Sequence, residues 1–153
     1  MLIFHEGRPG SGKSYEAAIN RIIPALKSGR KVYAYIEGLN HEKFSEVTEL
    51  PLELIQSLLF QITKDQVKTI HDHVSNDSLV IIDELQDFFP SGRDKLSPEI
   101  TEFVTQHRHR GLDVIVMGQD YRDCHNLWKR RIDQLYQFTK RDAVGYPLFI
   151  RVV

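Results

Sequence analysis

Short apolar runs alternate with amphipathic stretches along most of the chain. Buried strands are predicted where the apolar runs occur, at residues 2–4, 32–36, 79–82 and 113–117. Between the first two runs, apolar side chains recur at helical spacing from Tyr15 to Leu26, which predicts an amphipathic helix. Because strands alternate with helices, we expect an α/β domain with a mainly parallel sheet and helices on both of its faces.

Cap and breaker residues set the expected borders of these helices. Gly29 is a suitable C-cap for the first helix, and Pro24 within it predicts a kink or a split. Ser97-Pro98-Glu99 has the features of a helix start: a capping serine, a proline in the first turn and an acid. The helix that follows is expected to end at Gly111.

Other segments have weaker patterns. Helices are also predicted at 52–60, 64–74 and 124–131. Two final strands, at 135–139 and 148–153, flank Gly145 and predict a C-terminal antiparallel hairpin.

Length and composition limit the functions open to the chain. Its 153 residues make one domain of ordinary size, with the 41% hydrophobic and 27% charged residues of a soluble globular protein. Since 20 Lys and Arg nearly balance 21 Asp and Glu, any contact with nucleic acid or an anionic membrane requires a local basic patch. The single cysteine, Cys124, excludes an internal disulfide. No apolar run approaches the ~20 residues needed to cross a bilayer.

The strongest chemical signal lies between the first strand and the first helix. The segment Gly7-Arg8-Pro9-Gly10-Ser11-Gly12-Lys13-Ser14 has the spacing of the Walker A phosphate loop. Its glycines let backbone N–H groups approach phosphate oxygens, and the following helix adds the positive end of its dipole. We expect Lys13 to contact the outer phosphates, Ser14 to ligate Mg²⁺, and Tyr15 to complete the nucleotide-binding segment. The fold is therefore predicted to be a P-loop NTPase.

A pair of acids follows the third predicted strand. In Leu79-Val80-Ile81-Ile82-Asp83-Glu84, four apolar residues bring a carboxylate to the carboxyl edge of the sheet, where ligands of α/β proteins bind. Asp83 is predicted to hold the Mg²⁺ shell, and Glu84 to act as the base that orients the attacking water. Together with the phosphate loop, this Walker B pattern predicts ATP hydrolysis.

Three further residues are candidates for catalysis. Gln119 follows the strand at 113–117 and would face the γ-phosphate if that strand lies between those ending at His5 and Ile82. Arg108 and Arg110 are within His107-Arg108-His109-Arg110 at the end of a helix, where cations are stabilising in themselves. One of the two arginines could instead reach a neighbouring subunit's ATP.

Other functions remain open on the residues alone. A small-molecule kinase would need a substrate pocket and an arginine-rich lid, for which residues 37–77 are poorly suited. A nucleotide-gated interaction module would bind ATP with little turnover. Thr139-Lys140-Arg141-Asp142 resembles the guanine-reading motif of small GTPases, but Gln86 stands where those proteins have glycine, and Glu84 directly follows the strand-end aspartate.

The motifs together resemble those of the zonular occludens toxin family, which includes filamentous phage assembly proteins. The resemblance is carried by residues 5–14, by Ile82-Asp83-Glu84-Leu85-Gln86, by residues 106–113 and by Gly118-Gln119, and covers nearly the whole chain. It implies the N-terminal, cytoplasmic ATPase domain of a longer protein with one span in the inner membrane. The chain's end within a predicted strand agrees with that expectation. The implied partners are other copies in a ring, single-stranded DNA and phage assembly proteins, and the implied role is extrusion of the phage DNA through the inner membrane.

Overall fold

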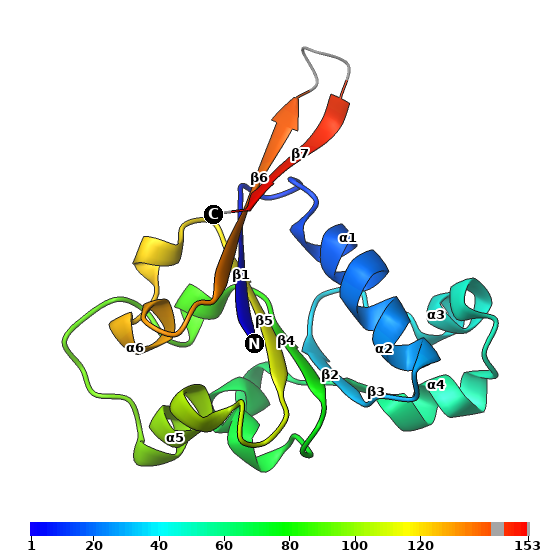
Figure 1. Ribbon diagram of the computed structural model, residues 1–153, viewed down its shortest axis with the longest axis horizontal. Helices are drawn as coiled ribbons and strands as arrows, with labels where there is room; N and C mark the ends of the chain where they lie inside the picture. Colours follow the sequence, from blue (N-terminus) through cyan, green and yellow to red (C-terminus); the bar gives the residue numbers. More distant parts are fainter. Residues whose placement is uncertain (142–145, 153) are drawn as a thin grey trace.

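A single sheet organises the chain. The computed structural model describes residues 1–141 and 146–152. Within these ranges a seven-stranded sheet has the order β3-β2-β4-β5-β1-β6-β7 (Figure 1). The strands are β1 (Leu2–Glu6), β2 (Val32–Tyr35), β3 (Leu59–Gln61), β4 (Leu79–Ile82), β5 (Asp113–Gly118), β6 (Gln134–Arg141) and β7 (Tyr146–Val152). All neighbours pair in parallel except β6 and β7, which form the predicted antiparallel hairpin.

Helices cover both faces of the sheet, as predicted. One face carries α1 (Lys13–Ala17), the π-helical segment η1 (Ala18–Ile22), α2 (Ile23–Lys27), α3 (His41–Thr48) and α4 (Leu52–Leu58) (Figure 1). The other carries the 3₁₀ segment η2 (Lys64–Asp72), α5 (Pro98–Gln106) and α6 (Asn126–Lys129). Two more 3₁₀ turns, η3 (Leu85–Asp87) and η4 (Tyr121–Asp123), follow β4 and β5.

Alternation along the strands produces two cores. In β1, Phe4 packs with Phe103 of α5 and Trp128 of α6, whereas Ile3 packs on the opposite face with Ile22 and Leu26. The central strands β4 and β5 contribute apolar side chains to both cores, which explains their continuous hydrophobic sequence. Because helices cover both faces of the central sheet, its strands can present polar groups to solvent only at the two edges where they begin and end.

The predicted caps at Ser97 and Gly29 are confirmed. Ser97 Oγ accepts a hydrogen bond from the backbone N–H of Ile100 at 3.2 Å, and Gly29, just after α2, has a left-handed φ of 77°. The helix expected to end at Gly111 ends at Gln106 instead, and Gly111, with a φ of 67°, lies in the turns between α5 and β5. Pro24 splits the first helix as predicted, because it lacks the N–H that would continue the α-helical ladder. The change is absorbed by η1, which precedes α2.

The segment from 37 to 77 departs from the predictions in two places. The helix predicted at 52–60 ends at Leu58, because the next three residues pair with β2 as the short edge strand β3. The helix predicted at 64–74 is the 3₁₀ segment η2, interrupted where Thr69 has non-helical dihedrals. The strand β3 was not predicted because three residues are too few to show the alternating pattern of a strand. The 3₁₀ form of η2 was not predicted because the spacing of apolar residues does not distinguish a 3₁₀ helix from an α-helix.

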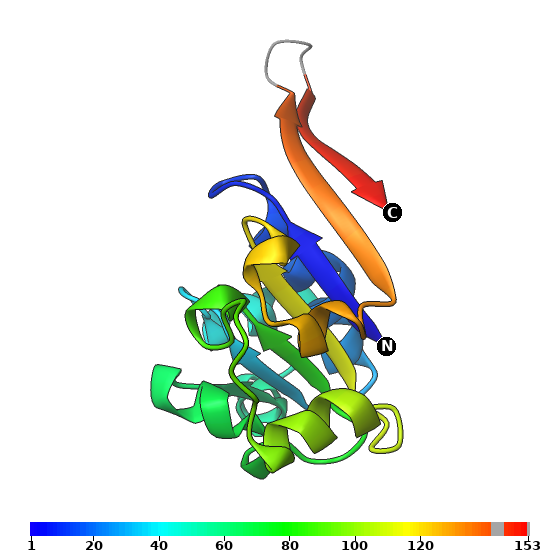
Figure 2. The same ribbon diagram turned by 90° about the vertical axis from the view of Figure 1, so that its left-hand side faces the viewer.

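The β6–β7 hairpin extends past the rest of the sheet on the side where β1 ends (Figure 2). It therefore rises beside the segment that follows β1, which is the predicted phosphate loop. Gly145, the predicted centre of the hairpin turn, and Val153 lie outside the described residues.

Candidate nucleotide-binding site

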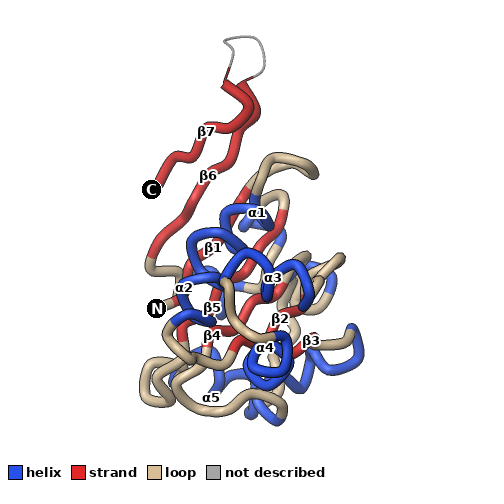
Figure 3. Tube along the Cα trace, turned by 90° about the vertical axis from the view of Figure 1, so that its right-hand side faces the viewer, coloured by secondary structure: helices blue, strands red, loops and turns tan. Residues whose placement is uncertain are grey.

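Most of the predicted site residues lie at one edge of the sheet. β1, β5 and β4 are parallel, and β5 lies between the other two. Their carboxyl ends therefore place the loop 7–12, Gln119 and the pair Asp83-Glu84 at the same edge of the sheet. The labels of β1, β5 and β4 follow one another in this order in Figure 3. This confirms the predicted strand order on which the role of Gln119 depends.

The loop after β1 has the backbone that a phosphate cradle requires. Gly10 and Gly12 have left-handed φ values of 73° and 98°, which favour glycine. Gly7 needs the absence of a side chain for another reason: a Cβ there would lie 2.5 Å from Ser11 Oγ and 3.0 Å from Phe138. The loop is thus packed against β6 and turns directly into α1.

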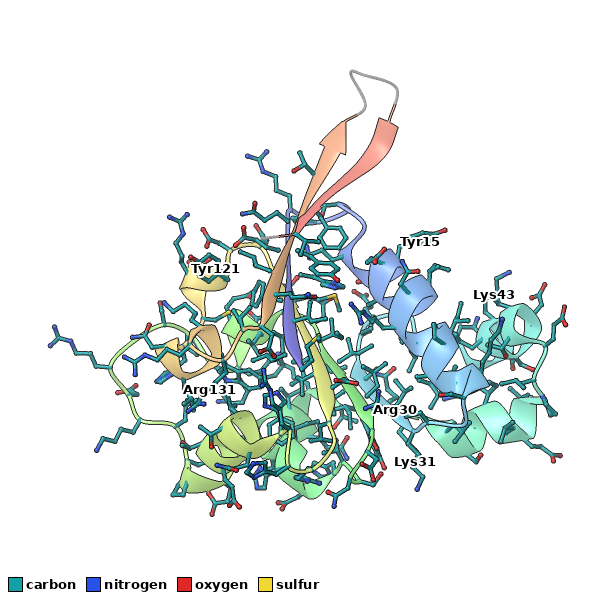
Figure 4. All side chains as sticks on the ribbon, in the orientation of Figure 1. Tyr15, Arg30, Lys31, Lys43, Tyr121 and Arg131 are labelled. Carbon is teal, nitrogen blue, oxygen red and sulfur yellow. The ribbon has the colours of Figure 1, made fainter. Side chains whose placement is uncertain are left out.

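The Lys13 side chain is buried within the phosphate loop. Its Nζ donates to the carbonyl of Gly7 at 2.6 Å and to that of Arg8 at 3.2 Å. These carbonyls hold the ammonium at the place where phosphate oxygens could replace them as its partners. Ser14 is exposed at the first turn of α1, and Tyr15 points outward from that turn (Figure 4).

Asp83 extends β4 toward the loop. Its N–H donates to Tyr35 O at 3.0 Å, and its Oδ1 accepts from the N–H of Glu84 at 2.9 Å. Burial raises the pKa of Asp83 and outweighs the hydrogen bond from the Glu84 N–H, which lowers it; the charge of Glu84 raises it further, and the Lys13 ammonium acts to lower it. That electrostatic effect means that the Lys13 ammonium lies near enough to Asp83 to act on its charge. The hydroxyl of Ser14 and the carboxylate of Asp83 are hard oxygen donors, which suit Mg²⁺ bound with phosphates and water.

Glu84 occupies a strained position beside Asp83. Its φ of 52° places a non-glycine residue in the left-handed region, at a cost of about 1–2 kcal/mol. Its Oε2 accepts from Gln86 Nε2 at 2.5 Å. The sequence does not predict this contact between Gln86 and Glu84, because residues that meet across a tight turn have no periodic spacing.

Comparison with known proteins decides the family. The family model of the zonular occludens toxin (Zot) matches residues 1–153. The chain belongs to this family. It is 35% identical to the Gene 1 protein of Xanthomonas phage phiLf, over 95% of this chain and 36% of that protein. It is 27% identical to the zona occludens toxin of Vibrio cholerae serotype O1, over 95% of this chain and 42% of that protein. The chain thus spans roughly two fifths or less of these relatives' length.

Solved structures show the same fold. The N-terminal domain of the Neisseria meningitidis zonular occludens toxin superimposes with a TM-score of 0.64 at 18% identity, over 99% of this chain and 92% of that one. The genome packaging NTPase of Sulfolobus turreted icosahedral virus 2, in complex with ATP-gammaS, gives a TM-score of 0.66 at 21% identity, over 92% and 76%. The predicted P-loop NTPase fold is therefore confirmed.

In this Zot-family chain, a pocket of about 620 Å³ adjoins the phosphate loop. It is lined by Glu6, Gly7, Arg8, Pro9, Ser11, Gln119, Gln137, Phe138 and Thr139. Glu6 orders its wall by accepting from Tyr121 N at 2.9 Å and from Gln137 Nε2 at 3.1 Å. The sequence predicted Gln119 and the loop at this place but not the β6 residues, whose polar positions resemble those of any strand.

His5 lies beneath the loop with no exposed surface. Its Nδ1 is 3.3 Å from Lys13 O, and its ring stacks on Tyr136 and contacts Phe138, with centroids 5.3 and 5.0 Å away. Burial, together with the charges of Arg21 and Lys13, lowers the pKa of His5 to about 4. A neutral His5 thus joins the backbone of Lys13 to strand β6.

The two predicted arginines do not join the site. They follow α5 and precede β5, and so lie at the amino edge of the sheet, opposite the loop. Arg108 pairs with Asp133. Arg110 donates to Asn76 Oδ1 at 2.8 Å, to Val74 O at 2.5 Å and to His71 O at 3.4 Å. Within one chain these contacts are structural, and a role in a neighbour's site stays a prediction.

Two features are absent from the described residues. No three His, Cys, Asp or Glu side chains gather there in a way that could hold a metal ion by themselves. No helix in residues 1–141 and 146–152 has the length and apolarity to span a membrane. Of the guanine-reading resemblance at 139–142, Asp142 lies outside the described residues.

Proposed function

We propose that this domain binds ATP with Mg²⁺ at the carboxyl edge of the sheet and hydrolyses it. The observation that carries the proposal is the common position of Lys13 and Asp83 at the carboxyl edge, after strands β1 and β4 on either side of β5, where the Lys13 charge acts on Asp83. Backbone N–H groups of residues 10–13 and the Lys13 ammonium bind the phosphates. Ser14 and Asp83 hold Mg²⁺, Glu84 orients and deprotonates water, and Gln119 contacts the γ-phosphate or that water.

The biological role proposed for this activity is phage assembly with movement of single-stranded DNA. Family membership and the genome packaging NTPases among the fold relatives support it. We propose that the domain faces the cytoplasm and is attached to the inner membrane through a later segment of a longer protein. The coverage of the curated relatives, well under half, is consistent with such a segment.

A cationic surface is available for the DNA backbone. Arg93 and Lys95, on the loop after η3, and Arg130, after α6, line one hollow of about 530 Å³. Arg131, next in the chain, is exposed on the same side as α6 (Figure 4). None of the four side chains makes an ion pair or hydrogen bond within the described part of the chain. Unpaired cations of this kind neutralise phosphates without reading bases.

Assembly into a ring is the proposed route to full activity. Of the two candidate arginines for action in a neighbour's site, Arg108 is the better suited, because it is exposed and has one ionic partner. Arg110 is held by three groups of its own chain and would have to abandon them all.

Phosphate release from Mg-ATP tests the proposal. Glu84→Gln removes the base but keeps the shape, and should lower kcat by about 10²–10⁴-fold while ATP still binds. Tight ATP binding with release that Glu84→Gln leaves unchanged at every protein concentration would favour the nucleotide-gated module instead. Release that requires a small-molecule acceptor would favour a kinase.

A further inference from the structure

The side chain of Gln86 bridges the ends of two strands. Its Nε2 donates to Glu84 Oε2 at 2.5 Å, while its Oε1 is buried with no hydrogen-bond partner in the described structure. The amide lies over Gly118, the last residue of β5. A Cβ on Gly118 would lie 2.7 Å from Gln86 Oε1 and 3.2 Å from Phe4 Cζ. The missing side chain at Gly118 therefore provides the room that Gln86 occupies.

The backbone fixes Gln86 relative to Glu84. The left-handed conformation of Glu84 turns the chain at the end of β4, and η3 begins there, with Asp87 N donating to Glu84 O at 2.9 Å. Leu85, between the two polar residues, is fully buried in the core. Because Leu85 anchors the turn, the amide of Gln86 can move little unless its own side chain rotates.

We infer that Gln86 is the positioning residue for Glu84, an inference that rests on the proposed ATPase function. The bond to Oε2 limits rotation of the Glu84 carboxylate and leaves Oε1 to accept a proton from water. The neutral amide leaves the negative charge of the carboxylate in place, whereas a Lys or Arg at position 86 would neutralise it. Gly118 contributes indirectly, since any side chain there would displace the amide from Glu84.

Steady-state kinetics of two variants and their combination test this inference. Gln86→Met keeps the length of the side chain and removes the donor, so kcat should fall about 10-fold while the Kd for Mg-ATP stays within about twofold. Gly118→Ala should lower kcat in the same way, because the added methyl displaces the Gln86 amide. The double variant should be no slower than Gln86→Met alone, since both changes act through one contact. Gln106→Met, on the exposed surface of α5, is the matched control and should leave kcat unchanged.

The other outcomes overturn the inference. An unchanged or raised kcat in folded Gln86→Met would show that the amide does not position the base. Losses that multiply in the double variant would show that Gly118 and Gln86 act separately. If ATP turnover by the wild type does not depend on Glu84, the proposed function and this inference are overturned together. If Glu84→Gln lowers kcat as expected but Gln86→Met does not, the inference alone is overturned.

Discussion

The two edges of the sheet differ in how their acids are paired, although the carboxyl edge also has one ion pair, between Asp120 and Arg122. At the amino edge, Asp113 accepts from Arg30 at 2.7 Å and from the amine of Met1 at 3.1 Å, and Arg108 pairs with Asp133. At the carboxyl edge, the described residues offer Asp83 and Glu84 no ion pair, and the Lys13 ammonium contacts only carbonyls.

The pKa values of Asp113 and Asp83 differ accordingly, and Asp120, whose pKa is lowered by the hydrogen bond from Arg122, resembles Asp113. Burial raises the pKa of Asp113, but its bonds to Arg30 and to the amine of Met1 more than offset that effect and lower it overall. Burial also raises the pKa of Asp83, and there the nearby Lys13 charge is too weak to reverse it. Paired charges stabilise a fold, whereas a half-buried acid with a raised pKa and no ionic partner is a feature of ligand sites. We therefore assign stability to the amino edge and chemistry to the carboxyl edge.

The largest expected effect concerns Asp83. Asp83→Asn should lower the Mg²⁺-dependent kcat at least about 100-fold, because a metal ligand is lost. Its Tm at pH 7 should not fall, since a raised pKa means that the fold disfavours the ionised acid. Phosphate release and thermal melts measure the two quantities. A lower Tm with normal kcat would mean that Asp83 stabilises the fold and takes no part in catalysis, which would contradict the contrast between the two edges.

The second prediction tests whether the support beneath the loop is structural. Unfolded His5 gains a proton below pH 6.5, whereas the folded residue does so only near pH 4, so stability falls as pH drops through this window. At ~1.4 kcal/mol per unit, the loss is about 3 kcal/mol. Urea unfolding at pH 7 and pH 4.5 should therefore show a smaller drop for His5→Phe than for the wild type. The exposed control His109→Gln should keep the wild-type drop, and equal drops in all three would contradict the account.

The third prediction addresses the amino edge directly. Arg30 donates to three backbone carbonyls and to Asp113, and lies at the far end of the α1–α2 helix from the loop (Figure 4). Arg30→Ala should lower the free energy of unfolding by about 2–3 kcal/mol and leave ATP affinity unchanged. Its exposed neighbour is the control, and Lys31→Ala should cost less than about 0.5 kcal/mol. Weaker ATP binding by folded Arg30→Ala would mean that the edges are not independent.

The smallest effect separates the cations beside α6 from those on the opposite side of the sheet. Replacing both Arg130 and Arg131 with Gln should reduce the slope of log K against log salt for a single-stranded DNA oligonucleotide by about 1.4. Lys27→Gln with Lys43→Gln, on the opposite side of the sheet, should leave the slope unchanged. The binding measurement needs no ATP, so it stands apart from the hydrolysis assays. Equal slopes in both double variants would remove the cationic surface from the proposal.

Much of this fold was predictable because its strands are short, apolar and separated by clear caps. The elements that were not predicted owe their form to tertiary partners. Leu59 to Gln61 form a strand only because β2 has a free edge, and η2 differs from an α-helix in its backbone and not in its apolar spacing.

The site residues likewise include some that the sequence predicts and some that it does not. Lys13, Asp83 and Gln119 were predictable, because motif spacing together with parallel topology brings strand ends to one edge. The contributions of Glu6, Gln86 and Gln137 were not, since each depends on a side-chain contact between residues whose spacing has no pattern. Arg108 and Arg110 show the converse: a suggestive sequence whose observed partners all lie at the other edge.

Mg-ATPγS titration of the wild type and Lys13→Ala by calorimetry tests the central claim most directly. The account predicts one binding site per wild-type chain, at least about 100-fold weaker binding by Lys13→Ala, and similar Tm values, because Lys13 contacts only carbonyls of its own loop. Equal affinity of the two proteins would contradict the assignment of the carboxyl edge as the nucleotide site.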